Sequence, residues 1–351
     1  MVLGGCRLVV AFAALGLAAG FLQPARAATD EQIAAITGAI LQADGPTASH
    51  LLATLPDTQL DTKDRGLRAC MAKRLSSGPA DETVISPVTG QPDPFAADVL
   101  KTYRSYWRTA VMNPKLRDAA EQKLRTDLVR LLHLSPTTTM DNAEQALASR
   151  LERSGFHSLE GRTGLLREFM LWSKQESKTY RVSLPEGSNE TRVFFMDRFA
   201  SMGWSSYLTC DRTGTGGWTK PDGLYVVVPA YSSLTDENFR VNFLAHESQH
   251  YLDHKQFPGL SPWELEYRAK LVELAYANET MKRTLLRFAS DQGDDPASPH
   301  SYADKRVLIA MKARLRLTPG ASLADVPVAK LNKAAVAELL ADSSKRRAAM
   351  R

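Results

Sequence analysis

One short stretch limits the possible folds of this chain more than any other feature. Residues 244–250 read Leu-Ala-His-Glu-Ser-Gln-His and lie inside a predicted helix over 236–255. Residues four apart on a helix share one face, about 6 Å apart. His246 and His250 can therefore bind one metal ion, and Glu247 lies next to the first imidazole, where it can act as a base. The stretch requires a helix that faces a second element able to complete the site.

A third ligand is expected because catalytic zinc takes three protein ligands and leaves one position for water. A second helix is predicted to begin at Ser261, after a short connection that brings the two helices together. His250 and Glu266 each lie about 7.5 Å from that connection, so Glu266 is the expected ligand. Glu264 is an alternative, although it fits a capping box with Ser261. Glu273, about 18 Å along the second helix, is a weaker one, and a ligand from elsewhere stays open.

Other polar residues border the predicted site. His254 extends the histidine row, but it lies about 80° around the helix from His246. It is either a substrate contact or a surface histidine. Asp253 can orient a ligand imidazole through a hydrogen bond. The alternative role for Glu266 is an exposed pair with Lys270, four residues further on the same helix.

The pattern resembles the zincin metallopeptidases, and among them the gluzincin type with its downstream glutamate ligand. The resemblance covers about residues 223–277 and does not reach the N-terminal half. It implies that His246, His250 and Glu266 bind one zinc ion and that Glu247 is the general base. The implied activity is hydrolysis of a peptide or amide bond by a zinc-activated water. The implied partners are a peptide or protein substrate, with a cell-wall peptide among the candidates.

The chain also departs from the gluzincin pattern. Lys270 follows the Glu-x-x-Ala sequence that begins at Glu266, in place of a frequent aspartate. The resemblance further implies that a strand over 223–231 lines the cleft and pairs with an extended peptide. Hydrolysis needs a donor for the developing oxyanion. The candidates for this donor are His300, Tyr302 and Tyr276.

A function of another class stays open. An exported binding or scaffold protein can keep a zincin fold and use zinc structurally or not at all. Glu247 argues against this alternative because a structural site needs no base. Lys270 and the unassigned oxyanion donor argue for it.

We expect an α+β, mostly helical fold in four parts. Residues 1–27 form a signal peptide and 28–160 a helical N-terminal region. A zincin-like catalytic domain over 161–317 combines a small mixed sheet with the active-site helix, and 318–351 form a helical, basic C-terminal tail.

Apolar periodicity and breaker residues predict the individual helices, strands and loops. Helices are expected over 30–43, 64–75, 95–112, 114–134, 142–154, 165–174 and 302–317 and from 321 onward, strands over 180–184, 191–196 and 223–231, and loops over 83–94 and 210–223.

The N-terminus indicates export. An apolar run over 8–22 precedes Ala-Arg-Ala at 25–27, which is typical of a secretory cleavage site. The run is shorter than the ~20 residues that a membrane-spanning helix needs, so an uncleaved anchor is the lesser alternative. We expect a periplasmic or secreted protein without stable membrane insertion. After cleavage Cys70 and Cys210 remain, and they either form a disulfide in an oxidising compartment or stay as two thiols.

The charge balance argues against nucleic acid as a partner. The chain has 44 basic and 39 acidic residues and a formal net charge of +5 over 351 residues. This excess is mild, and no dense basic block precedes the last residues. The basic cluster over 345–347 is expected to be a solvated tail.

Overall fold

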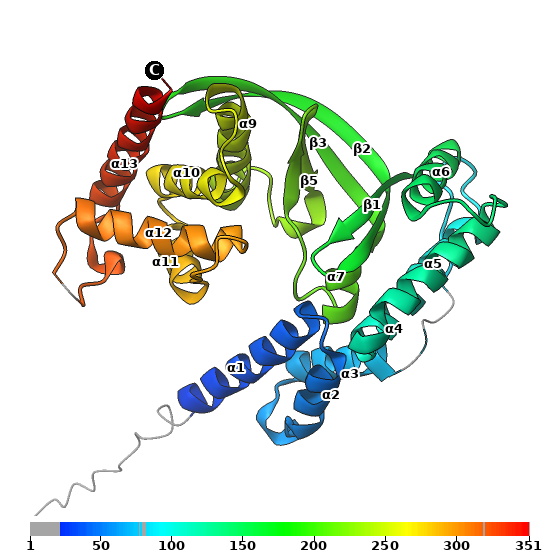
Figure 1. The fold of residues 1–351 in the computed structure, drawn as a ribbon. Helices are drawn as coiled ribbons and strands as arrows, with labels where there is room; N and C mark the ends of the chain where they lie inside the picture. The colour runs from blue at the N-terminus through cyan, green and yellow to red at the C-terminus, as the bar shows by residue number, and fades with distance from the viewer. Residues whose placement is uncertain (1–21, 77, 79–81, 319, 351) are drawn as a thin grey trace, which may run out of the picture.

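A strongly curved sheet forms an arch between the N-terminal and the C-terminal helices (Figure 1). The computed structural model describes residues 22–76, 78, 82–318 and 320–350. The predicted α+β, mostly helical fold is confirmed. Most of the predicted signal peptide, residues 1–21, lies outside the described residues. Among the helices that are described, none combines the length and the apolar character needed to cross a bilayer.

The N-terminal region is helical, as predicted. Asp93 caps the fourth helix, since its carboxylate accepts a hydrogen bond from the amide of Ala96 at 2.9 Å. The loop predicted over 83–94 is present and contains one isolated bridge, between Ile85 and Pro92. The second helix was not predicted. The helices are α1 (Leu22–Leu41), α2 (Gly45–Thr54), α3 (Thr62–Ser76), α4 (Pro94–Met112), α5 (Arg117–Leu131) and α6 (Met140–Arg153), with 3₁₀ turns η1 (Asp57–Gln59) and η2 (Pro114–Leu116).

The sheet has five strands in the order β1-β2-β3-β5-β4. Neighbours are antiparallel except β3 and β5, which are parallel. The loop predicted over 210–223 is wrong in part, because four of its residues form the edge strand β4. The strands are β1 (His157–Thr163), β2 (Leu166–Leu184), β3 (Gly187–Met202), β4 (Gly217–Lys220) and β5 (Gly223–Val227).

The helix predicted over 165–174 is wrong, because this segment is the first half of β2. Its side chains are buried on both faces of the sheet: Phe169 and Leu171 belong to one apolar core, whereas Met170 and Trp172 belong to another. A strand buried on both faces has a continuous apolar run instead of alternation, so its period does not distinguish it from a buried helix.

The strands predicted over 180–184 and 191–196 are confirmed; they form a hairpin, and both are much longer than predicted. Strands β2 and β3 pair from Leu184 opposite Gly187 to Met170 opposite Met202. The tip of this hairpin carries Glu186, whose side chain is only 2% exposed. A long hairpin therefore reaches across the molecule to the C-terminal helices (Figure 1).

Two large apolar cores lie along the chain. The first joins the N-terminal helices to residues of β2 and of α7 (Trp204–Thr209), among them Phe169 and Leu208. The second joins β3 and β5 to the C-terminal helices. The first core thus continues beyond residue 160 into the sheet.

The C-terminal half begins with a continuous helical run. Its parts are α8 (Glu237–Phe239), the π-helical η4 (Arg240–Ala245) and α9 (His246–Gln256), which confirm the helix predicted over 236–255. The strand predicted over 223–231 is β5 followed by the 3₁₀ turn η3 (Val228–Ala230). The later helices are α10 (Pro262–Tyr276), α11 (Met281–Ser290), α12 (Pro299–Arg314) and α13 (Val328–Ala349), with a 3₁₀ turn η5 (Leu323–Asp325).

The end of α13 is largely exposed, but it is fastened to the rest of the protein by ion pairs. Arg346 bonds to Asp342 at 2.7 Å and to Glu264 at 2.8 Å, and Arg347 bonds to Glu186 at 2.9 Å. The helix also buries apolar residues such as Leu339 in the second core. The prediction for 345–347 is therefore wrong for Arg346, whereas Lys345 and Arg347 are exposed; Arg346 fastens the helix to α10 and Arg347 bonds to the hairpin tip.

A buried ion-pair cluster holds the hairpin tip against three helices. Arg268 on α10 is fully buried and pairs with Glu186 at 2.5 Å, Asp253 at 2.9 Å and Asp342 at 2.7 Å. These partners come from the hairpin, α9 and α13. One guanidinium thus connects four elements around the second core.

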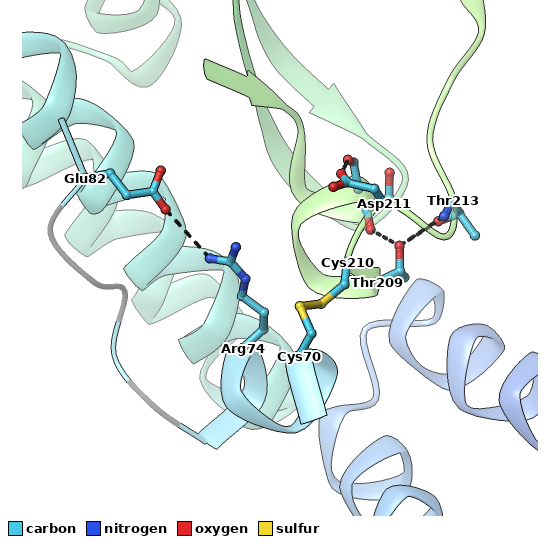
Figure 2. Close-up of a disulfide and its surroundings, with 9 residues drawn as sticks. Cys70, Arg74, Glu82, Thr209, Cys210, Asp211 and Thr213 are labelled. Atoms are coloured by element: carbon cyan, nitrogen blue, oxygen red, sulfur yellow. Dashed lines mark hydrogen bonds and ion pairs between the residues drawn. A yellow bond between two sulfur atoms is a disulfide. The ribbon is translucent and has the colours of Figure 1, made fainter. Parts of the chain in front are cut away.

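Cys70 and Cys210 form a disulfide, which decides between the two alternatives left open by the sequence. Figure 2 shows the bond between α3 and the end of α7. It joins residues 140 apart in the chain. The bond therefore ties the N-terminal helices to the segment that follows the long hairpin.

Candidate metal centre

The connection between α9 and α10 places the candidate ligands. Ser261 caps α10, and Glu264 completes the predicted capping box by accepting from the Ser261 amide at 2.9 Å. Glu264 also pairs with Arg346. It is thus occupied at the start of the helix, and Glu266 is the glutamate that lies beside the histidines.

Three donor atoms converge as predicted. The Nε2 atoms of His246 and His250 are 3.1 Å apart. The Glu266 carboxylate lies 3.3 Å from Nε2 of His250 and 3.6 Å from Nε2 of His246. The three donor atoms lie within 4.8 Å of one another, and all three residues are buried. This group can hold a metal ion.

The donor spacing fits a single small cation. Donors about 2.05 Å from one tetrahedral ion lie about 3.3 Å apart. The two imidazole nitrogens are 3.1 Å apart, and the Glu266 carboxylate approaches them with different oxygens, Oε1 at 3.3 Å from His250 and Oε2 at 3.6 Å from His246. Two imidazoles and one carboxylate are a donor set that zinc accepts. Three protein ligands leave one coordination position for a water or a substrate atom.

Glu273 fixes the orientation of the His246 ring. Its Oε1 lies 2.8 Å from Nδ1 of His246, so the ring donates Nδ1–H to the carboxylate and keeps the Nε2 lone pair for a cation. Glu273 in turn accepts hydrogen bonds from Asn242 at 2.9 Å and from Arg287. From the sequence, Glu273 was only a weak candidate for the third ligand. In the structure it bonds to the candidate ligand His246, on the ring nitrogen that does not face the other ligands.

Asp253 does not orient a ligand imidazole, so that prediction is wrong. Its two oxygens accept from Gln249 at 2.8 Å and from Arg268 at 2.9 Å. It therefore belongs to the buried ion-pair cluster around Arg268.

Opposing contributions set the pKa values of Glu266, His250 and Glu273. Burial raises the pKa of Glu266, but hydrogen bonds from His250 and His300 and the nearby imidazole charge outweigh it and hold that pKa far below its usual range. Burial lowers the pKa of His250, yet the carboxylates around it, first Glu266, raise it overall. Burial raises the pKa of Glu273, and His246 more than reverses this. The site therefore favours carboxylate anions beside a cation.

Glu247 lies where the edge of the sheet meets the site helix. Its Oε2 accepts a hydrogen bond from Thr219 of β4 at 2.5 Å. Strand β4 comes this close because Gly217, with φ +153°, has no side chain. A Cβ atom there would collide with the carbonyl oxygen of Tyr225 and the ring of Phe243. The strand over 223–231 was predicted to line the cleft, but β5 is an internal strand and β4 is the edge strand beside α9.

The three candidate oxyanion donors lie in different places. Nδ1 of His300, on a side chain that is 67% exposed, is 3.0 Å from Oε2 of Glu266. The Tyr302 hydroxyl accepts from Arg306 at 2.8 Å, and its ring packs on Trp263. Tyr276 lines a separate cavity near η4. Of the three, His300 is the residue that touches the candidate metal centre.

The other sequence alternatives are settled by contacts. Lys270 pairs with buried Asp304 at 2.9 Å, not with Glu266. The resemblance implied an aspartate at position 270; the residue there is instead a lysine that forms this buried pair. His254 is exposed, as expected for a surface histidine.

Two contacts of the candidate site were not predicted from the sequence, Glu273 with His246 and Thr219 with Glu247. Glu273 lies seven residues after Glu266, two helical turns along the same face of α10, and this spacing could have placed it near the histidines. Thr219 lay in a segment predicted as a loop, and no sequence signal connected it to Glu247.

Comparison with known proteins identifies no relative: no family model, no curated protein and no solved structure matches this chain.

Proposed function

We propose that the protein is an exported zinc-dependent metallohydrolase that cleaves a peptide or amide bond. The observation that carries this proposal is the convergence of His246, His250 and Glu266, with Glu247 adjacent and held by Thr219. A site with three protein ligands and a neighbouring base is typical of a catalytic centre, since a structural zinc site usually has four ligands.

Zinc is the cation that suits this site best. The donor set combines two imidazole nitrogens with one carboxylate, whereas Mg²⁺ and Ca²⁺ prefer oxygen ligands alone. When bound, the ion would supply Lewis-acid chemistry, which polarises a carbonyl group and lowers the pKa of a water molecule.

The residues of the chain would share the remaining work. Glu247 accepts the proton of the attacking water and delivers it to the leaving amine. Thr219 keeps the Glu247 carboxylate on the side of the site that borders β4. His300, on an exposed side chain at Glu266, is the candidate donor to the developing oxyanion. The open edge of β4 suits an extended peptide that adds as a further strand.

The signal-like segment over 1–27 supports export, and the Cys70–Cys210 disulfide is typical of an oxidising compartment. A peptide or protein outside the cytoplasm is therefore the proposed substrate class, and a cell-wall peptide remains within it.

The test compares the wild type with Glu247→Gln, Glu266→Ala and Glu264→Ala. We expect one zinc per chain in the wild type, in Glu247→Gln and in Glu264→Ala, and loss of zinc in Glu266→Ala. A peptide-library digest should be cleaved by the wild type and by Glu264→Ala, which removes a helix cap and no ligand. Glu247→Gln should lose at least ~100-fold in turnover, the usual contribution of a general base.

Three outcomes would contradict the proposal. Full activity of Glu247→Gln would remove Glu247 from the mechanism. Retention of zinc by Glu266→Ala would remove Glu266 from the ligand set. Zinc bound without any cleavage would favour the binding or scaffold protein that uses the ion structurally.

A further inference from the structure

A hollow lies at the disulfide, far along the chain from the candidate metal centre. It has a volume of about 720 Å³ and lies between α3, α4, the end of β3 and α7. Cys70 and Cys210 form part of its wall. Figure 2 shows the bond with Arg74 one turn further along α3.

Basic side chains dominate the lining of this hollow. Lys63, Arg74, Arg104 and Arg212 line it against one acidic residue, Asp211. Among the contacts of the described residues, neither Lys63 nor Arg212 has an acidic partner. The hollow therefore carries a local positive excess on a protein whose overall charge is only mildly positive.

The two central arginines are held in place by the protein. Arg74 and Arg104 both lie over the ring of Tyr207, at 4.0 and 4.7 Å from its centroid. Glu82 pairs with Arg104 at 2.5 Å but lies 3.9 Å from Arg74. The Glu82 carboxylate is thus the shared acidic partner of both guanidinium groups.

Arg104 has unused hydrogen-bonding capacity in a buried place. Its side chain is only 8% exposed, and its Nε has no hydrogen-bond partner. A buried donor without a partner costs free energy, which an added acceptor recovers. The amino nitrogens of Arg104 bond to Glu82 at 2.5 Å and to the carbonyl oxygen of Ala200 at 3.5 Å, so Nε is its unpartnered donor. Arg74 lies 3.9 Å from Glu82, and its guanidinium fork matches the paired oxygens of a carboxylate or a phosphate.

Part of the remaining lining is apolar. Leu67, Phe199 and Met202 line the same hollow. A ligand that only supplied charge would leave these surfaces against water. An organic anion, with an oxyanion group at one end and an apolar group at the other, satisfies both parts of the lining.

We propose that this hollow, which we call the disulfide pocket, binds a small organic anion. Its oxyanion group, a carboxylate or a phosphate, lies at Arg74 and Arg104, and its apolar portion lies against Phe199 and Met202. This binding is independent of the candidate metal centre.

The test measures binding to the full chain by ligand-observed NMR, which detects millimolar affinity. The probes are phenyl phosphate, benzoate, inorganic phosphate and phenol at matched ionic strength. We expect saturable binding of phenyl phosphate or benzoate, at least ~10-fold tighter than of phenol or inorganic phosphate, because each good charge-assisted contact is worth about 1.4 kcal/mol or more. Whether phenyl phosphate or benzoate binds more tightly identifies the oxyanion.

A matched pair of variants locates the binding. Arg74→Gln/Arg212→Gln removes two charges from the pocket, and both residues are at least partly exposed, so folding should persist. Arg153→Gln/Lys330→Gln removes two exposed charges elsewhere. The first pair should weaken binding at least ~10-fold and the second less than ~2-fold, by the same contact energies. The proposal is overturned if no probe binds saturably, if both pairs weaken binding equally, or if phenol binds as tightly as the anions.

Discussion

Glu273 and His246 are joined by a short hydrogen bond, 2.8 Å between Oε1 and Nδ1, on the side of the ring away from the other candidate ligands. Glu273 is almost completely buried, and Asn242 and Arg287 hold its second oxygen. The carboxylate therefore sets both the tautomer and the angle of the imidazole before any cation arrives.

Removal of this charge should weaken metal binding without removing a ligand. We expect Glu273→Gln to lower zinc affinity by ~10–100-fold, the usual effect of losing such an outer partner. A competition titration with a chelator measures this affinity. Glu279→Gln, which changes an exposed glutamate just after α10, should leave it unchanged. Equal affinity in wild type and Glu273→Gln would show that Glu273 has no part in the site.

Local sequence rules predicted the centre of this site. The spacing of His246 and His250 on a helix, and the capping box that occupied Glu264, were sufficient to choose Glu266. These features depend on the period of one helix and on one short connection. The disulfide stayed open because pairing depends on how far apart the fold places residues 140 apart in the chain.

Features that depend on distant segments could not be predicted. The segment that contains Phe169 and Met170 is apolar on both faces, because separate cores cover its two sides. Thr219 reaches Glu247 only because β4 joins the sheet edge, and Arg346 bonds to Glu264 only because α10 lies beside α13. Each of these depends on tertiary contacts that sequence period does not encode.

The buried cluster around Arg268 should dominate the stability of the second core. Arg268→Met leaves the buried Asp253 carboxylate without a cation, whereas Asp342 and Glu186 keep Arg346 and Arg347 as partners. We expect a loss of about 3–5 kcal/mol in the free energy of unfolding, because uncompensated buried charge is costly. Urea titration measures it, with exposed Arg153→Met as control. A loss below ~1 kcal/mol would mean that water reaches the cluster.

The disulfide should stabilise the first core and leave the metal centre unaffected. We expect Cys70→Ser/Cys210→Ser to lower the free energy of unfolding by about 2–4 kcal/mol, since a long closed loop constrains the unfolded chain. Cys210 packs against the first core. The residues directly before the site helix α9, such as Phe243 and Ala245, belong to the second core. Zinc affinity should therefore not change. Unfolding of the reduced wild type should match that of the double variant, and a difference would indicate another effect of the serines.

Glu160 on β1 should make stability depend on pH. Burial raises the pKa of its carboxyl from 4.5 to about 7, and its Oε1 has no hydrogen-bond partner. In the unfolded chain the group titrates near 4.5, so the folded state binds the proton more tightly. The stability that this proton contributes is complete below pH ~4.5 and is lost as pH rises through about 7.

Glu160→Gln tests this pH dependence, because the amide stays neutral at every pH. We expect the variant to be as stable as the wild type near pH 4.5 and more stable by about 2 kcal/mol at pH 8, where the wild type must ionise a buried group. Urea unfolding at both pH values measures the difference. Exposed Glu190→Gln on β3 should show no such crossover. A stability gain that is equal at both pH values would mean that ionisation of Glu160 is not its cause.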